Sequence, residues 1–342
     1  MRNAGKINGG IVGMGGLAVN ERVPSIARMT DSAIATGNSN LVSELEKRDT
    51  LIREPLTSLT YTRDIPVKVG GGWVDVVSAL NSDYAVSGGT GSALAAASGS
   101  NSPRVMQANF DKDTFATHVF EIIMRIKFID MERSKVTGRA LDTLLADGIR
   151  LAYDKHMEEN VYIGMLGAPG LLNNPNVTAA GASAGAGGGY DFASKTADEI
   201  LEDVNQLILD TWSQAEHDRS ALPNHIIMPY DQYNDIATRK VSPIAEKTIL
   251  TFLEENNIAS KNGGNLVIGA TSFCKGAGVG GLDRMACYVH NEKFVAVEEL
   301  VPLYRSMTAP NIDAVAFDSL YMANLSQVEF FYTQTVRYLD GI

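Results

Sequence analysis

The chain has 342 residues, enough for about two or three domain-sized units or one elaborate one. Hydrophobic residues make up 45% and charged residues 20%, which excludes disordered, collagen-like and coiled-coil classes. The formal net charge is −11, so the chain as a whole is not a cation built to neutralise phosphates. Two cysteines, Cys274 and Cys287, are too few for a disulfide framework and fit a reducing compartment.

The sequence predicts neither a membrane span nor an export signal. The longest apolar stretch, 119–129, is interrupted by Glu121, Arg125 and Lys127, whereas a spanning helix needs about 20 largely apolar residues. The weakly apolar run 11–19 contains three glycines, and no small-residue cleavage site follows it. We therefore expect no membrane partner and no export.

The first part of the chain predicts an arm followed by a strand. Residues 1–40 are rich in Gly, Ser, Thr and Asn and contain no aromatic residue, so they cannot build a core alone. We expect this arm to be held from outside its own fold, with a neighbouring copy of the chain as the simplest candidate. Residues 59–69 are rich in Thr, Tyr, Ile and Val, which predicts a strand that ends at Gly70.

A long charge-free segment predicts the tip of a projecting β-arm. Between Asp83 and Arg104 lie twenty residues without a charge, mostly Gly, Ser and Ala. The chain then alternates between apolar and charged residues over 120–128, which is typical of a strand with one buried face. Strands on both sides of a charge-free tip predict an extended β-loop.

The period then changes to that of a helix, from about 134 to 162. Six residues form its predicted apolar stripe: Leu141, Leu144, Leu145, Gly148, Ile149 and Ala152. The stripe is narrow, which suits a helix that lies across a thin sheet. The interval 160–190 contains no charge and is rich in Pro, Gly and Asn over 168–175, which predicts a structured loop and a domain boundary.

The remaining chain alternates between helices and strands and predicts a compact α/β unit. An amphipathic helix over 196–216 begins with a capping box of Thr196 and Glu199. A second helix is predicted from Ser242 and Pro243 to about 257. Strands are predicted at 225–228, 266–268, 285–290 and 294–298, followed by one long closing strand over 326–338.

The glycine-rich motif Gly276–Gly281 matches G-x-G-x-x-G, but its surroundings argue against a nucleotide site. A dinucleotide-binding loop needs a strand before it and a helix after it, whereas a predicted strand follows here. A looser match at 13–18 has no strand before it. Both segments are therefore interpreted as flexible loops.

No pattern of side chains predicts catalysis or metal binding. Cys274 and Cys287 stand 13 positions apart with only His290 nearby, so we expect buried or neutral thiols. The five histidines are scattered along the chain: His118, His156, His217, His225 and His290. Adjacent carboxylates at 158–159 and 298–299 are expected on solvated faces. We therefore assign no catalytic, cofactor-binding or metal-binding residue, although a spatial constellation can be hidden from the sequence.

Three stretches resemble the tailed-bacteriophage major capsid proteins that share the Hong Kong 97 type fold, in particular an encapsulin-like branch. Leu45–Val77 (LEKRDTLIREPLTSLTYTRDIPVKVGGGWVDVV) resembles the start of the extended loop of those proteins. Gly167–Val177 (GAPGLLNNPNV) resembles the loop after their spine helix, and Tyr332–Ile342 (YTQTVRYLDGI) resembles their closing strand. The order of the predicted elements along the whole chain is also that of this family.

The resemblance implies an α+β fold with five parts. They are an N-terminal arm (1–50), the extended loop with its flanking strands (51–130), the spine helix and following loop of a peripheral domain (131–174), an α/β axial domain (175–290), and return strands of the peripheral domain (291–342). It implies a major capsid protein without enzymatic activity or cofactor. Such a protein self-assembles as pentamers and hexamers into an icosahedral shell in the virion, after assembly in the host cytoplasm.

The resemblance also implies partners. Besides other copies of itself, these are scaffolding, portal and decoration proteins, and double-stranded DNA enclosed without sequence-specific binding. Some relatives carry an N-terminal scaffolding segment that this sequence lacks, so we expect a separate scaffold or none. Others crosslink through lysine and asparagine, and no such pair can be placed here, Lys68 included.

Two alternatives are left open by the sequence. One is an encapsulin-type compartment shell, which has the same fold but encloses cargo enzymes. The other is an intracellular α/β enzyme that binds a nucleotide at Gly276–Gly281, for which replacement of Gly278 would abolish activity.

Overall fold

The structure is a computed structural model that describes residues 58–86, 105–137, 141–242 and 246–342. The expected N-terminal arm, 1–50, and most of the charge-free tip, 87–104, lie outside the described residues. Contacts within the chain separate 1–56 from 57–342, and the description below concerns the second of these units.

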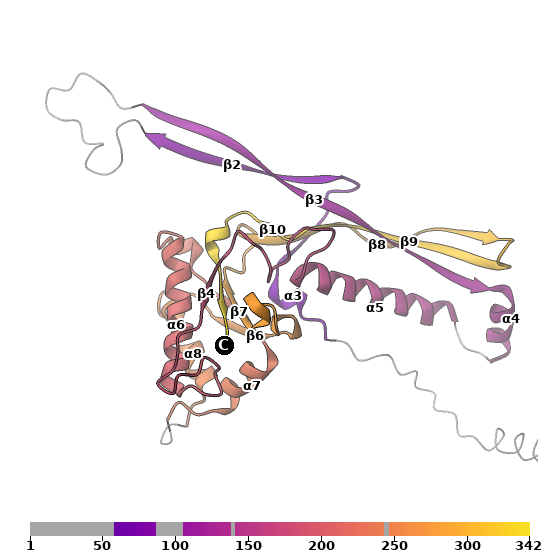
Figure 1. Cartoon of the computed structure of the whole chain (residues 1–342). Coiled ribbons are helices and arrows are strands. Elements are labelled where there is room, and N and C mark those ends of the chain that lie inside the picture. The colour runs from indigo at the N-terminus through magenta and orange to yellow at the C-terminus, as the bar shows by residue number, and fades with distance from the viewer. Residues whose placement is uncertain (1–57, 87–104, 138–140, 243–245) are drawn as a thin grey trace, which may run out of the picture. The chain divides into compact units, whose positions relative to one another are not determined.

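A six-stranded sheet runs through the unit in the order β1-β8-β9-β3-β2, with β10 paired to β8 (Figure 1). Its strands are β1 Val67–Val69, β2 Val76–Val86, β3 Met106–Lys127, β8 Val295–Asn311, β9 Ala316–Ser326 and β10 Glu329–Phe330. The longest strand, β3, changes partner along its length. Residues 117–127 pair antiparallel with β9, and residues 106–116 pair antiparallel with β2. The β2–β3 hairpin therefore continues the sheet past the end of β9.

A five-stranded sheet in the order β4-β11-β7-β5-β6 forms the centre of an α/β unit. Its strands are β4 Thr178–Gly181, β5 His225–Met228, β6 Val267–Ala270, β7 Arg284–Tyr288 and β11 Val336–Asp340. Four helices accompany it: α6 Ala197–Gln214, α7 Tyr230–Thr238, α8 Ile249–Glu255 and α9 Ile258–Lys261. One cluster of buried side chains joins these helices to the sheet. Every residue of β5 and β7 is buried, so this unit encloses its own core.

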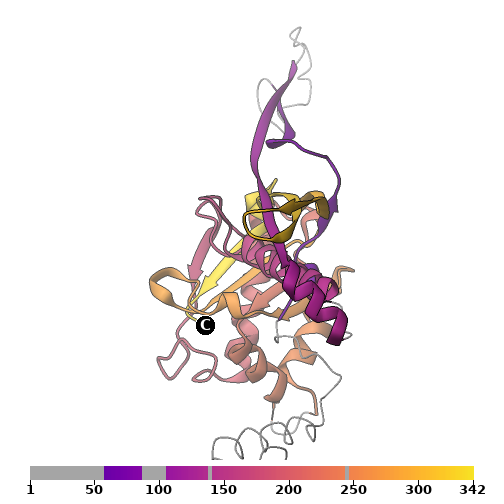
Figure 2. The ribbon, with the colours of Figure 1, turned by 90° about the vertical axis from the view of Figure 1, so that its right-hand side faces the viewer.

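The helix α5, Leu141–Tyr162, lies along the six-stranded sheet and contacts β3 and β8 (Figures 1 and 2). Four of its buried apolar side chains repeat every four residues: Ile149, Tyr153, Met157 and Val161. Tyr153, Met157 and Val161, together with Tyr162, belong to a second buried cluster that also takes in side chains of both sheets. Two shorter helices flank this region, α3 Tyr61–Asp64 and α4 Phe128–Thr137.

Several local predictions are confirmed. Thr196 caps α6 in a capping box with Glu199, as the spacing predicts. The strand over 225–228 is present with those bounds, and strands occur near 266–268 and 285–290. Phe120, Ile122, Met124 and Ile126 are more buried than the residues between them, as the alternation in β3 predicts.

The predicted strand over 59–69 is wrong for most of its length. Residues 61–64 form α3, and only Val67–Val69 is a strand. The backbone N–H of Thr60 donates to both carboxylate oxygens of Glu158 on α5, at 2.9 and 3.1 Å. These tertiary contacts outweigh the β-propensity of the segment.

The predicted helices differ from the structure in where they begin. The helix expected over 134–162 corresponds to the end of α4 and to α5, with 138–140 outside the described residues, and Phe128, assigned to the strand, starts α4. Of the six residues in the predicted stripe only Ile149 is buried, because the C-terminal half of α5 forms its contacts. The helix expected from Pro243 begins at Ile249, where the Thr248 side chain accepts from the backbone N–H of Thr251.

The last part of the chain holds the largest difference. The strand predicted at 294–298 continues to Asn311 and forms a hairpin with β9, and three register shifts accommodate its irregular stretch around Pro302. The single closing strand over 326–338 is divided into β10 and β11 by a 3₁₀ turn, Thr333–Thr335. The closing strand was expected to return to the peripheral domain, but β11 instead pairs with β4 and β7 in the five-stranded sheet.

Candidate functional site

The β2–β3 hairpin leaves large apolar side chains in solvent. Leu80 is 77% exposed and Phe110 is 76% exposed. The register pairs Leu80 with Lys112 and Ser82 with Phe110, so the two apolar side chains lie diagonally on one face of the ribbon. Further apolar residues along the hairpin are more than half exposed: Val76, Tyr84, Val105 and Met106. A contiguous exposed apolar surface of this kind marks an interaction site.

The hairpin also has two free strand edges. Among the described residues, β2 pairs only with β3, and residues 106–115 of β3 pair only with β2. Each strand therefore presents a row of backbone N–H and C=O groups to its surroundings, which is a template for pairing with another chain. Apolar side chains and unpaired edges thus occur together on the same two strands.

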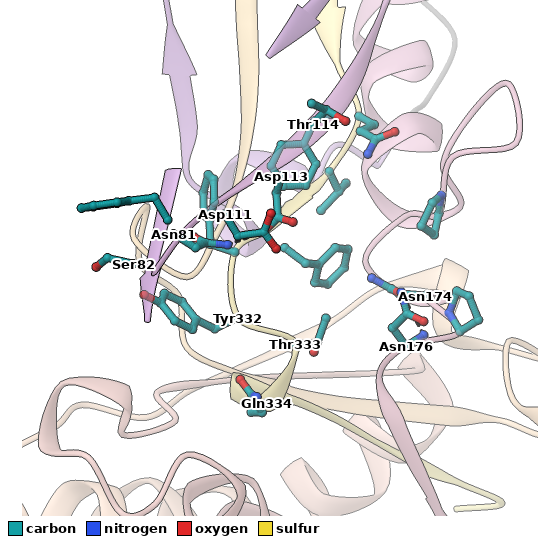
Figure 3. A pocket seen from close by; sticks show the side chains of 18 of the residues that line it. Asn81, Ser82, Asp111, Asp113, Thr114, Asn174, Asn176, Tyr332, Thr333 and Gln334 are labelled. Atoms are coloured by element: carbon teal, nitrogen blue, oxygen red, sulfur yellow. Dashed lines mark hydrogen bonds between the residues drawn. The ribbon is translucent and has the colours of Figure 1, made fainter. Parts of the chain in front are cut away.

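A polar groove of about 1030 Å³ lies at the base of the hairpin (Figure 3). Asn81, Asp111 and Asp113 enter it from the hairpin, and Asn81 donates a hydrogen bond to Asp113. Asn174 and Asn176 line the opposite side, and residues 332–334 line the side nearest the five-stranded sheet. Among the described residues neither aspartate forms an ion pair, so the groove carries uncompensated negative charge.

A buried polar junction anchors the start of the hairpin segment to the rest of the unit. Asp64 is fully buried, and its carboxylate accepts from Arg63, at 2.6 and 2.9 Å, and from the Tyr162 hydroxyl. His225 Nε2 lies 3.1 Å from Asp64 Oδ1. Burial alone would raise the pKa of Asp64, but the hydrogen bonds from His225, Arg63 and Tyr162 outweigh it and lower that pKa. The junction thereby ties α3 to α5 and to β5.

The glycines between β1 and β2 set the direction in which the hairpin leaves. Gly70, Gly71 and Gly72 all have a positive φ, a backbone angle that residues with a side chain rarely adopt. A Cβ on Gly71 would lie 2.6 Å from Leu300 Cδ2. The backbone angle therefore favours glycine at 71, and a larger residue there would also have to displace the Leu300 side chain.

The adjacent carboxylates do not all lie on solvated faces. Glu158 is only 3% exposed and accepts from the Thr60 backbone and hydroxyl, so the expectation of solvation is wrong for it. Burial raises the pKa of Glu158. Glu299 accepts from the Tyr153 hydroxyl, and Glu298 pairs with Lys68 at 3.6 Å. These carboxylates hold α5 and β1 in place.

The Gly276–Gly281 loop uses its amides within the chain. The Gly276 N–H donates to Asp283 Oδ1 at 2.9 Å, and the Val279 N–H donates to Asp340 Oδ2 at 3.1 Å. The element that follows is the strand β7, as predicted, and a helix N-terminus for a pyrophosphate does not follow the loop. Carboxylates bound by these amides would repel a phosphate, which disfavours the nucleotide hypothesis.

Both thiols are buried, as expected. Burial raises the pKa of Cys287 to about 12 and raises that of Cys274 well above its usual value, so neither is a thiolate at neutral pH. No cluster of three or more His, Cys, Asp or Glu side chains suited to a metal ion occurs in the described ranges. None of the helices described is long and apolar enough to cross a membrane.

The fold brings histidines together that the sequence left scattered. His118 on β3 meets His156 on α5, with 3.1 Å between their Nε2 atoms. His225 and His290 lie with their ring centroids 5.2 Å apart. Sequence reasoning missed both pairs, and also the Asp64 junction, because each involves residues on separate elements.

Comparison with known proteins adds an independent line of evidence. The family described as major capsid protein matches residues 91–342. No curated protein matches the chain.

Solved capsid structures share the fold at low sequence identity. The capsid of Myoviridae phage XM1 is similar with a TM-score of 0.72 and 18% identity over 88% of this chain and 98% of that chain. The capsid of a native GTA particle has a TM-score of 0.58 and 14% identity over 91% of this chain and 99% of that chain. The structure of Microbacterium phage Oxtober96 has a TM-score of 0.57 and 10% identity over 89% of this chain and 97% of that chain. The expected α+β fold of the Hong Kong 97 type is therefore confirmed. Because the family match covers most of the sequence, the chain belongs to the major capsid protein family.

Proposed function

We propose that this major capsid protein assembles as pentamers and hexamers into the icosahedral shell of a tailed bacteriophage, with its β2–β3 hairpin lying on a neighbouring copy. The observation that carries the proposal is the hairpin itself. Its apolar side chains are exposed and both of its strand edges are unpaired among the described residues. Contact with another copy would bury the side chains and pair the edges. As a major capsid protein, the chain is part of the virion.

The five-part division of the chain belongs to this proposal, with one change. The arm, the extended loop, the peripheral domain and the axial domain keep the limits given above, but β11 is grouped with the axial sheet because it pairs with β4 and β7. The shell would enclose double-stranded DNA without reading its sequence. The net charge of −11 supports confinement of DNA over tight binding to it.

Scaffolding, portal and decoration proteins are further proposed partners, and we propose no enzymatic role. The loop Gly276–Gly281 supports the absence of an enzymatic role. Its amides bind the carboxylates of Asp283 and Asp340, and these negative charges disfavour a phosphate there. Replacing Gly278 is therefore expected to affect folding of the loop and not a chemical step.

The experiment compares assembly of the purified full chain with that of Phe110→Ser, which places a polar group on the exposed apolar face. Size-exclusion chromatography with light scattering and electron microscopy measure the particles. We expect shells or capsomers from the unaltered chain and unassembled chains from Phe110→Ser. Phe110→Leu is the matched control, because it keeps an apolar side chain and should assemble.

Equal thermal melting of the three proteins would show that Phe110→Ser is folded. A Phe110→Ser chain that assembles as well as the unaltered protein would overturn the role given to the hairpin. An unaltered chain that remains a monomer at every concentration would overturn self-assembly itself.

A further inference from the structure

Two histidines meet where the hairpin-bearing strand crosses the long helix. His118 lies on the part of β3 that pairs with β9, opposite Leu325, and His156 lies on the C-terminal half of α5. Their Nε2 atoms are 3.1 Å apart, and their ring planes are inclined by 65°. Both rings are half-buried, and Phe120 packs against His156 with 5.0 Å between ring centroids.

This separation fits two ligands of one metal ion. Nitrogens bound to zinc at about 2.0–2.1 Å lie about 2.9 Å apart at a right angle and about 3.3 Å apart at the tetrahedral angle. The observed 3.1 Å falls between these values. Imidazole is a ligand that Zn²⁺, Cu²⁺ and Ni²⁺ all accept.

The surroundings favour the neutral form of both rings, which is the form that binds metals. Burial lowers the pKa of His118 and that of His156, and the neighbouring ring lowers the pKa of His118 further. Glu159 follows His156 by three positions on α5, and its negative charge raises the pKa of that ring, but by less than burial lowers it. A cation between the rings would therefore be attracted by Glu159.

The other histidines of the chain do not offer the same arrangement. His225 Nε2 is already engaged by Asp64, and His217 packs its ring against Trp212. All five histidines and both cysteines lie within the described residues.

We propose that His118 and His156 bind one divalent transition-metal ion, such as Zn²⁺, through their Nε2 atoms. No third His, Cys, Asp or Glu completes a cluster in the described part of the chain, so water would fill the remaining positions and the ion would exchange more readily than a structural zinc. When no ion is bound, one ring donates its Nε2–H to the other. Binding moves that proton to Nδ1 of the donor ring, so no net proton is released from a neutral pair.

The bound ion would link β3 to α5 directly. It would therefore stabilise the contact between the strand that continues into the hairpin and the helix that supports the sheet. This inference does not depend on shell assembly, and it can be tested on unassembled chains.

Isothermal titration calorimetry of the full chain with ZnCl₂ tests the site, alongside His118→Gln, His156→Gln and the double variant. We expect one ion per chain, and binding weaker by at least about tenfold when either histidine is replaced. His217→Gln is the matched control and should bind as the unaltered chain does. A second measurement, visible absorption on adding Co²⁺, reports nitrogen coordination in the unaltered chain even where a variant folds poorly.

Two results would overturn the site. One is an unaltered chain that gives no saturable heat with Zn²⁺ and only the spectrum of aqueous Co²⁺. The other is a folded double variant that binds Zn²⁺ as tightly as the unaltered chain.

Discussion

The five-stranded α/β unit and the β2–β3 hairpin obtain their stability in different ways. In the α/β unit every side chain of β5 and β7 is buried, and a closed cluster of apolar residues joins the sheet to its helices. In the hairpin, by contrast, residues 106–112 of β3 are all exposed. The first region encloses its own core, and the second exposes apolar side chains that no other described segment covers.

The difference teaches that the two regions should respond differently to mutation. We expect a side chain in the α/β unit to contribute to folding of the isolated chain, and one in the hairpin to contribute to the proposed association. The Asp64 junction stands between them, since it joins α3 to α5 and to β5. Four substitutions test this contrast through their effect on stability.

Replacing the junction carboxylate should have the largest effect. Asp64→Ala leaves Arg63, Tyr162 and His225 without their common acceptor, and we expect a loss of about 3–5 kcal/mol in the free energy of unfolding. Urea denaturation measures it. A loss below about 1 kcal/mol would mean that the hairpin segment is not anchored through this residue.

A cavity in the α/β unit should be nearly as costly. Ile226 is fully buried on the central strand β5, so Ile226→Ala removes contacts on all sides and should cost about 2–5 kcal/mol. The same denaturation experiment applies. An unchanged midpoint would contradict the view that this unit encloses its own core.

The buried carboxyl of Glu329 should make stability depend on pH. Neither of its oxygens has a hydrogen-bond partner among the described residues, and burial together with the charge of Glu298 raises its pKa to about 7 from an ordinary value of 4.5. The unfolded chain loses this proton near pH 4.5 and the folded chain only near pH 7. Stability should therefore fall as the pH rises through that window and level off above it.

Glu329→Gln replaces the titrating carboxyl with a neutral amide and so isolates the contribution of this carboxyl to the pH dependence of stability. At pH 8 the variant should be more stable than the unaltered chain by up to about 3 kcal/mol, and at pH 4 the two should be alike. Melting curves across this pH range measure the difference. A gain that is the same at both pH values would show that folding does not raise the pKa of this carboxyl.

The smallest effect is expected in the hairpin. Leu80→Ala should change the free energy of unfolding by less than about 0.5 kcal/mol, because this side chain is 77% exposed in the single chain. Measured on unassembled protein, a loss near that of Ile226→Ala would show that the hairpin folds onto its own chain. That result would remove the contrast between the two regions.

Elements with a strong local signal were predictable. The capping box of Thr196 and Glu199 and the short apolar strand at 225–228 need only their own residues, and both occur as expected. The strand β8 was underestimated because Pro302 and Pro310 argue against a continuous strand, and bulges opposite β9 accommodate the irregular stretch around Pro302. The candidate site was predictable only as an exposed arm, since the groove needs residues from three separate segments.

The sequence alone determined where apolar residues repeat with a period of two or about four and where Gly- and Pro-rich segments end helices and strands. It also determined that a charge-free loop connects two strands. These properties depend on neighbours along the chain. The tertiary structure decided that Asp64 meets His225, which is 161 positions away, that His118 meets His156, and that β11 joins the five-stranded sheet. Such contacts form between elements whose own patterns are equally compatible with other partners, so only the packed fold selects among them.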